Sequence, residues 1–176
     1  SLMPNEIRFV VPVGLPATTG TNTYPVVINN NGSIIRSTIQ INPAQPDIFS
    51  TTNDAGGRAI VLNVTNPAAP TPEPFTVTSM NMSGTTVPTV LQIMLTGVRN
   101  VQTSQVTVRI GTTDITGVAN ILRVGPTDMP GVDQLNVQLP AGLAGAGDVP
   151  VIVSVTINSI TYTSRPADSA PHIQIN

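Results

Sequence analysis

The residues that could support hydrolytic catalysis are few in this chain. A hydrolytic triad needs a nucleophile, a base and an orienting acid, yet His172 is the only histidine and the sequence contains no cysteine. The base could therefore be only His172 or a carboxylate. An internal repeat, described below, places His172 at the position that Thr38 holds in the other copy. This equivalence indicates a polar strand position, and we predict no catalytic residue.

Carboxylate pairs could support glycoside hydrolysis if two of them faced each other across a cleft. The nine acidic residues are spread over the chain, and several stand beside turn residues. An Asp in a turn normally accepts hydrogen bonds from its own backbone. We therefore predict turn roles, and not catalysis, for Asp54, Asp114, Asp128 and Asp148.

Two short segments could contribute oxygen ligands to calcium. They are Asn53-Asp54 and Thr127-Asp128. Neither has the dense Asp-x-Asp spacing of a specific site, so we predict no metal site. The glycine-rich segment 142–147 lacks the lysine and the following helix that a phosphate-binding loop needs. We predict a turn there, and we expect no cofactor.

Arginine and aromatic side chains offer little for binding a polymer. The seven basic residues are all arginines, scattered singly from Arg8 to Arg165, whereas nucleic-acid binding needs a clustered basic stripe. Arg165 is predicted to pair with the nearby Asp168. Polysaccharide binding usually uses aromatic platforms. The chain has no tryptophan, and its other aromatic residues are Tyr24, Tyr162, Phe9, Phe49 and Phe75.

The composition favours a folded protein outside the cell. Hydrophobic residues make up 40% of the chain and its net charge is only −2, unlike a disordered sequence. No apolar run approaches the roughly 20 residues of a membrane span. The lack of lysine, the many Thr, Asn, Gly and Pro residues, and sequons at Asn31, Asn63 and Asn81 favour an extracellular or cell-surface location. Because the chain starts at Ser1 without a signal peptide, we expect a processed chain or a fragment of a longer one.

Short runs of alternating apolar and polar residues predict an all-β fold. Clear examples are 7–11, 106–110 and 135–139, and period two over five to eight residues indicates half-buried strands. Turn signals separate the runs at intervals typical of a sandwich or a barrel, and of these we favour the sandwich. The predicted fold class is an immunoglobulin-like β-sandwich without helices. Further strands are predicted at 24–29, 34–41, 58–65, 74–80, 88–96, 118–124, 149–157 and 172–175.

Turn-forming residues support this assignment. Asn31-Gly32 is a strong signal for a hairpin turn between two apolar runs. The proline-rich segment 66–74 cannot be a central strand, because proline lacks the N–H that a ladder requires. We predict a stiff, extended connection there.

An internal repeat divides the chain. Residues 5–16 align with 133–144, residues 25–28 with 150–153, and residues 38–42 with 172–176. Self-similarity in a fixed order indicates tandem copies of one structural unit. We therefore predict an incomplete immunoglobulin-like module over residues 1–42 and a complete one over residues 43–176.

The first module lacks most strands of a sandwich. Three strands alone would leave an apolar face and strand edges open to water. We expect the other strands to come from a longer chain or from a neighbouring molecule through strand addition.

Several segments resemble the uncharacterised Solibacter C-terminal domain family. GVDQLNVQLP at 131–140, followed by GLAG at 142–145, is similar to that family's "pGxxQxNvxxP.gl.G" core. PDIF at 46–49 resembles its "PGIF" element with Asp in place of Gly, and LTGV at 95–98 resembles its "TGl" strand. The similarity covers most of 43–176, and residues 5–42 look like the end of a preceding copy. In that copy, EIR at 6–8 stands where the family favours Gln-Ile-Asn.

The resemblance implies immunoglobulin-like modules of large secreted or surface-displayed bacterial proteins, with no known activity. We therefore expect a non-enzymatic structural or adhesive module that associates with itself or with further such modules through β-strand edges, as in a polymer or filament. The alternative is an accessory module that binds polysaccharide or cell-wall material beside a secreted enzyme.

Overall fold

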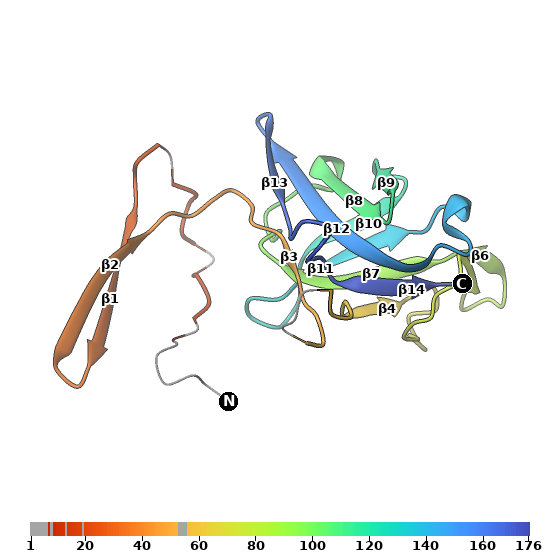
Figure 1. The fold of residues 1–176 in the computed structure, drawn as a ribbon, viewed down its shortest axis with the longest axis horizontal. Helices are drawn as coiled ribbons and strands as arrows, with labels where there is room; N and C mark the ends of the chain where they lie inside the picture. Colours follow the sequence, from red (N-terminus) through yellow and green to blue (C-terminus); the bar gives the residue numbers. More distant parts are fainter. Residues whose placement is uncertain (1–6, 8, 13, 19, 53–55) are drawn as a thin grey trace. The chain divides into compact units, whose positions relative to one another are not determined.

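The computed structural model describes residues 7, 9–12, 14–18, 20–52 and 56–176. The chain divides into two compact units, Ser1–Pro43 and Ala44–Asn176. We call them unit 1 and unit 2 (Figure 1). The predicted calcium-ligand segment 53–54 and the turn at Asp54 lie outside the described residues.

Unit 1 contains one antiparallel hairpin. Strand β1 (Tyr24–Asn30) pairs with β2 (Ser33–Ile39), with Asn30 opposite Ser33. The two residues between them, Asn31 and Gly32, have φ values of 49° and 92°, the left-handed conformation of a type I′ turn. The predicted Asn-Gly hairpin turn is confirmed.

The strand predicted at 7–11 is wrong for the residues described there. Residue 7 and residues 9–12 have no strand structure, and Ile7 and Phe9 are 63% and 60% exposed. Apolar alternation produces a strand only where a neighbouring strand supplies hydrogen bonds and a face to pack on. No described strand pairs with this segment.

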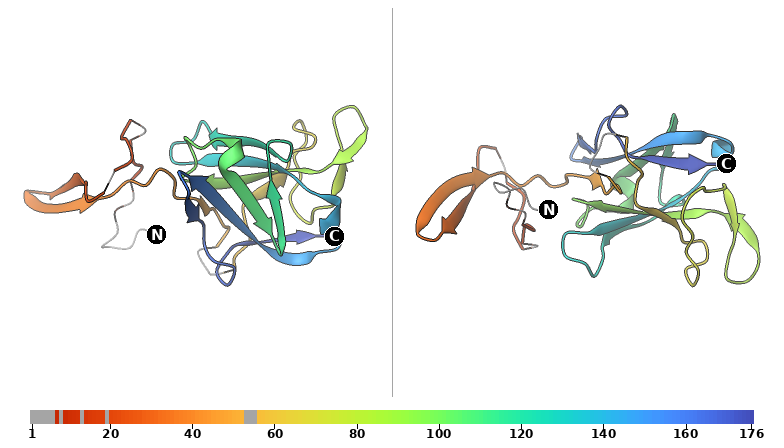
Figure 2. Two further views of the ribbon diagram at one scale, coloured as in Figure 1. Left: turned by 90° about the horizontal axis from the view of Figure 1, so that it is seen from above. Right: turned by 60° about the horizontal axis from the view of Figure 1, so that its bottom comes forward.

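Unit 2 contains two five-stranded sheets (Figures 1 and 2). In the first, the order is β10-β11-β7-β3, and β4 also pairs with β7. All of its pairings are antiparallel. The strands are β3 (Asp47–Ile48), β4 (Val61–Asn63), β7 (Val90–Thr96), β10 (Ile121–Pro126) and β11 (Asp133–Gln138).

The second sheet is built around one long strand, β12. The order is β13-β12-β8-β9, and β14 pairs with the first part of β12. These pairings are also antiparallel. The strands are β8 (Val106–Ile110), β9 (Thr113–Thr116), β12 (Gly147–Ile157), β13 (Ile160–Thr163) and β14 (His172–Ile175).

The remaining regular structure in unit 2 is short. Strands β5 (Thr78–Met80) and β6 (Thr86–Pro88) form a separate hairpin. The helical segments in the described part of the chain are two single 3₁₀ turns, Thr103–Gln105 and Ala141–Leu143. Within that same part, no helix has the length and apolar character to cross a membrane.

The core of unit 2 lies between the two sheets. Alternate residues of β12 (Val151, Val153, Val155) and of β7 (Leu91, Ile93, Leu95) are completely buried and belong to one cluster. Period-two burial places one face of each strand inside and the other outside. The all-β prediction is confirmed, and the two sheets form a β-sandwich.

Most predicted strands of unit 2 are present, and those at 106–110 and 172–175 have the predicted bounds. The run predicted at 118–124 is divided between a turn and β10, and β3, β9 and β13 were not predicted. The segment 66–74 is a connection, as predicted, but it contains a turn at 67–68 and is not extended throughout.

Two parts of the sequence repeat have the same strand register. In unit 1, Pro25 of β1 pairs with Thr38 of β2. In unit 2, Pro150 of β12 pairs with His172 of β14. These are the residue pairs that the repeat aligns, so β1 corresponds to β12, and the end of β2 corresponds to β14.

Candidate functional site: an arginine-centred cluster

Three segments of unit 2 converge beside β14. Arg58 forms a parallel bridge with His172, and the N–H of Ala59 donates to the carbonyl of His172 at 2.9 Å. Further along the same edge of β14, the N–H of Phe75 donates to the carbonyl of Gln174 at 2.9 Å. These backbone contacts bring the segment around 58 and the end of the proline-rich connection alongside one strand.

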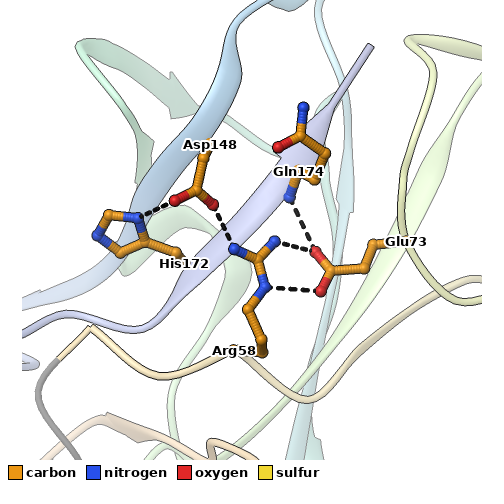
Figure 3. Close-up of polar contacts among 5 residues, drawn as sticks. All are labelled: Arg58, Glu73, Asp148, His172 and Gln174. Carbon is orange, nitrogen blue, oxygen red and sulfur yellow. Dashed lines mark hydrogen bonds and ion pairs between the residues drawn. The ribbon is translucent and has the colours of Figure 1, made fainter.

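The side chains at this junction form what we call the Arg58 cluster: Arg58, Glu73, Asp148, His172 and the backbone of Gln174 (Figure 3). Arg58 Nε donates to Glu73 Oε1 at 2.7 Å, and Nη2 donates to Glu73 Oε2. Its third nitrogen, Nη1, donates to Asp148 Oδ1. The N–H of Gln174 donates to Glu73 Oε2 at 2.8 Å. One guanidinium therefore binds two carboxylates.

Pairing with Arg58 lowers the pKa of both of its carboxylate partners. The hydrogen bond from Arg58 lowers the pKa of Glu73 despite partial burial, and the N–H of Gln174 lowers it further. The same guanidinium lowers the pKa of Asp148, with His172 contributing. The two carboxylates in turn raise the pKa of Arg58. At neutral pH both acids are ionised.

This electrostatic state bears on glycosidase chemistry. A pair of catalytic carboxyls needs one member with a raised pKa to act as general acid. Glu73 and Asp148 both have lowered pKa values, and each is held by the same guanidinium. The geometry suits a structural ion network that joins segments distant in sequence.

His172 lies at the edge of the cluster, where its Nδ1 is 3.1 Å from Asp148 Oδ2. This contact resembles the acid and base of a hydrolytic triad. Among the described residues, no serine or threonine hydroxyl is hydrogen-bonded to the ring. His172 is the first residue of β14, which confirms the prediction of a polar strand position.

Two of the predicted turn positions are wrong. Asp114 lies in β9, opposite Arg109 of β8, and accepts from Arg109 Nε at 2.6 Å. Asp148 lies in β12, opposite Gln174. Both acids follow a turn closely and already belong to a strand. Asp114 is paired with its cross-strand neighbour Arg109, whereas Asp148 is paired with Arg58 from another segment.

The other two acidic predictions have different outcomes. Asp128 lies in a bend, as predicted, but its neighbour Thr127 makes the turn contacts there. The local pair between Arg165 and Asp168 is wrong. Arg165 Nε donates to Asp47 Oδ1 at 2.9 Å, and Nη2 donates to the carbonyl of Ile48. Asp47 is the first residue of β3, and the packing of β3 places its carboxylate next to Arg165.

Of the two calcium candidates, Thr127-Asp128 lies within the described residues and Asn53-Asp54 lies outside them. Within the described ranges, no group of three or more His, Cys, Asp or Glu side chains could hold a metal ion. The segment 142–147 contains the end of a 3₁₀ turn, a second turn and the first residue of β12. The turn predicted there is confirmed.

The aromatic residues do not form an exposed platform in unit 2. Phe75 is 2% exposed, and Tyr162 packs against the core. Phe49 is half-buried. In unit 1, the hydroxyl of Tyr24 donates to the carbonyl of Pro16 at 3.1 Å, and Phe9 is exposed.

An open groove of about 350 Å³ lies beside β4 and β5. Its polar groups are largely paired within the protein. Asn63 Nδ2 donates to Ser79 Oγ at 2.8 Å, and that hydroxyl also contacts Thr89 Oγ1. The lining residues are Asn63, Asn66, Ala69, Thr71, Thr76, Thr78, Ser79 and Met80.

The three sequons differ in their surroundings. Asn31 lies in the exposed hairpin turn of unit 1. Asn63 uses its side-chain nitrogen in the contact with Ser79. Asn81 Oδ1 accepts from the N–H groups of Ser83 and Thr85.

No protein-family model, curated protein or solved structure matches this chain.

Proposed function

We propose that this chain is a non-enzymatic structural or adhesive module of a secreted or cell-surface bacterial protein, and that it associates with further copies or further modules through β-strand edges. The observation that carries the proposal is the half-exposed apolar face of the hairpin in unit 1. This proposal is supported by comparing residues of unit 1 with the residues of unit 2 to which the sequence repeat aligns them.

The apolar residues of the hairpin in unit 1 have buried counterparts in unit 2. Val26 and Ile28 of β1 correspond to Val151 and Val153 of β12, both 0% exposed. Val26 and Ile28 themselves are only half-buried. Ile35, which pairs with Ile28, is 56% exposed. Burying an apolar side chain stabilises a fold by about 1.5–3 kcal/mol, so covering this face is strongly favourable.

The strand order of unit 2 supports the immunoglobulin-like assignment. Immunoglobulin constant-type domains have one sheet in the order A-B-E-D and a facing sheet of C, F and G. The order β3-β7-β11-β10 follows the first pattern in chain sequence, and β8, β12 and β13 with β14 follow the second. In these terms, β1 and β2 correspond to the F and G strands of another module. An isolated two-stranded hairpin is only marginally stable in water.

The non-enzymatic part of the proposal is supported by the ion pairs of unit 2. Five of its acidic residues are paired with arginine: Asp47, Glu73, Asp114, Asp133 and Asp148. Groups held this way have little freedom to exchange protons with a substrate.

Sedimentation velocity over a concentration series tests the association. We expect the full chain to associate with increasing concentration. Replacing Val26 and Ile28 with Ser should weaken association, because both substitutions make the apolar face polar. A matched control is Val118→Ser in unit 2, since Val118 is 65% exposed. A monodisperse monomer at every concentration would contradict the proposal.

Polysaccharide binding is the second candidate, favoured by the groove lined with amide and hydroxyl groups. Binding on a glycan array that is lost on replacing Asn66, Tyr24 or Tyr162 with Ala would support it. Array-wide absence of binding would leave the structural proposal as the better one.

A further inference from the structure

The outer edge of β1 is unprotected. Within the described ranges, β1 and β2 form a two-stranded sheet, so β1 has a strand neighbour on one side. Proteins usually protect such edges with charged side chains, prolines or bulges. The sequence of β1, YPVVINN, contains no charged residue, and its single proline is Pro25 near the start. The backbone from Val26 onward can accept another strand.

Unit 2 shows what covers the corresponding edge. Strand β12, the counterpart of β1, pairs with β14 and β13 along one edge and with β8 along the other. On the β8 side, Val151 lies opposite Ile110 and Val153 opposite Val108. Val26 and Ile28 hold the same places on β1. The counterpart edge therefore takes an antiparallel strand with apolar residues at alternate positions.

The outer edge of β2 has a different counterpart. Strand β13 lies at the end of its sheet in unit 2. No strand pairs with the outer edge of β13 among the described residues. The end of β2 corresponds to β14, whose outer edge takes only isolated bridges from Arg58 and Phe75 in the described part of the chain. Of the two edges of the hairpin, that of β1 is therefore the one whose counterpart is covered by a regular strand.

We propose that β1 of a second copy of this chain covers this edge, as an antiparallel strand related by a two-fold axis near Val27. This inference rests on the proposed self-association and names its contact. In such a pair, Val26 of one copy lies opposite Ile28 of the other. Pairing of two β-branched residues repeats the contacts of Val151 with Ile110 and Val153 with Val108.

The hydrogen-bonding pattern of β1 suits this contact. Bonded and non-bonded pairs alternate along an antiparallel ladder. Pro25, which has no N–H, marks the set of positions that does not bond to β2. Val27 and Asn29 belong to the same set and direct their N–H and C=O groups to the open edge. Strand β1 has no charged residue, so pairing two copies of it brings no like charges together.

The contact also places the apolar faces of the two hairpins on the same side of one four-stranded sheet. A two-fold contact closes on itself. It gives pairs of chains, and a filament would need a second contact elsewhere.

Matched proline variants test the edge. Val27→Pro removes an N–H from the open edge of β1 without removing a bond to β2. Ile34→Pro makes the equivalent change on the outer edge of β2, and the two side chains are 53% and 54% exposed. In sedimentation equilibrium of the full chain, we expect Val27→Pro to weaken dimerisation by at least about tenfold. Ile34→Pro should leave it within about twofold, because it alters the other edge.

A cross-link provides a second test that does not depend on proline. The chain has no cysteine, so a single introduced cysteine reports its own neighbour. Val27→Cys should form a disulfide-linked dimer on mild oxidation, since paired strands bring Cα atoms within the range of a disulfide. Ile34→Cys should cross-link much less.

The outcomes separate the two proposals. A wild-type chain that stays monomeric overturns the proposed self-association and this inference together. A wild-type chain that dimerises, while Val27→Pro dimerises equally and Val27→Cys does not cross-link, overturns only the β1 contact. Loss of dimerisation in Val27→Pro together with cross-linking of Val27→Cys supports it.

Discussion

The guanidinium of Arg58 holds the carboxylate of Glu73 through two hydrogen bonds, although the two residues are 15 positions apart. The contact joins the segment around residue 58 to the end of the proline-rich connection 66–74. Both segments lie beside β14. The ion pairs of Arg58 with Glu73 and Asp148 therefore link β14 and β12 to two segments that have no regular secondary structure. The cluster stabilises an edge of the second sheet, where β14 has only a short pairing with β12.

Replacing Arg58 should therefore destabilise unit 2. Arg58→Met keeps the length of the side chain but leaves Glu73, whose side chain is 27% exposed, without its cation. We expect a loss of about 1–2 kcal/mol in the free energy of unfolding, reduced from a buried pair by solvent screening. Urea denaturation followed by circular dichroism measures it. Arg109→Met, at a pair with both side chains about half exposed, is the control and should change stability less.

Acid should weaken the same cluster. The folded-state pKa values of Glu73 and Asp148 are lower than their ordinary values of 4.5 and 3.8. Groups with depressed pKa values stabilise the fold above the unfolded-state pKa, and this contribution is lost as the pH falls through the folded-state pKa. The free energy of unfolding should be level near neutral pH and should fall below about pH 4.5. Thermal unfolding as a function of pH measures it.

The variant Arg58→Met provides the control for this pH profile. Without the guanidinium, the pKa values of Glu73 and Asp148 should return toward their ordinary values, and the decline in acid should be shallower. An equally steep decline in the variant would assign the acid sensitivity to other groups, such as Asp114, whose pKa Arg109 also lowers.

The sequence predicted the hairpin and strands well where the pattern is local. Asn31-Gly32 determines its own turn through backbone conformation, and β8 has an unbroken alternation of apolar and polar residues. The Arg58 cluster could not be predicted in this way. Its members are separated by up to 101 residues between direct partners, and they meet only because β14 has neighbours on both sides. No local pattern encodes which irregular segment lies beside a strand.

The wrong ion pair has the same cause. Proximity in sequence favoured Asp168 for Arg165, but packing brought Asp47 to the guanidinium from 118 residues away. Likewise, the apolar alternation at 7–11 resembles that of β11, yet the described residues there have no strand partner. Alternation of apolar and polar residues allows a segment to form a strand, but the strand forms only where another strand pairs with it.

Asp133 is a buried acidic residue of unit 2, and its removal should be destabilising. It is 3% exposed, accepts the N–H of Val98 at 2.9 Å and pairs with Arg99 at 3.2 Å. Asp133→Ala leaves a buried N–H and a partly buried guanidinium without their acceptor. We expect a loss of about 2–4 kcal/mol, measured by urea denaturation. Asp128→Ala, at an exposed bend, should change stability by less than about 0.5 kcal/mol.

Gly97 lies so close to the backbone of Gln45 that a side chain there would disrupt the contact. Its φ is 77°, and a Cβ placed on it would lie 1.9 Å from the carbonyl oxygen of Gln45. The same two residues are joined by a hydrogen bond of 3.0 Å from the N–H of Gln45 to the carbonyl of Gly97. Gly97→Ala must therefore separate two backbones that β3 and β7 hold together, and we expect a loss of at least about 3 kcal/mol.

The matched control for Gly97 is Gly142→Ala. A Cβ at Gly142 would meet nothing within 4 Å, and its backbone lies in a 3₁₀ turn that alanine adopts without strain. This substitution should be neutral or should stabilise the protein by up to about 1 kcal/mol, because alanine lowers the entropy of the unfolded chain. Thermal unfolding of both variants measures the difference. Equal stability of the two would show that the turn after β7 can move away from Gln45, and that the contact does not fix the position of β3.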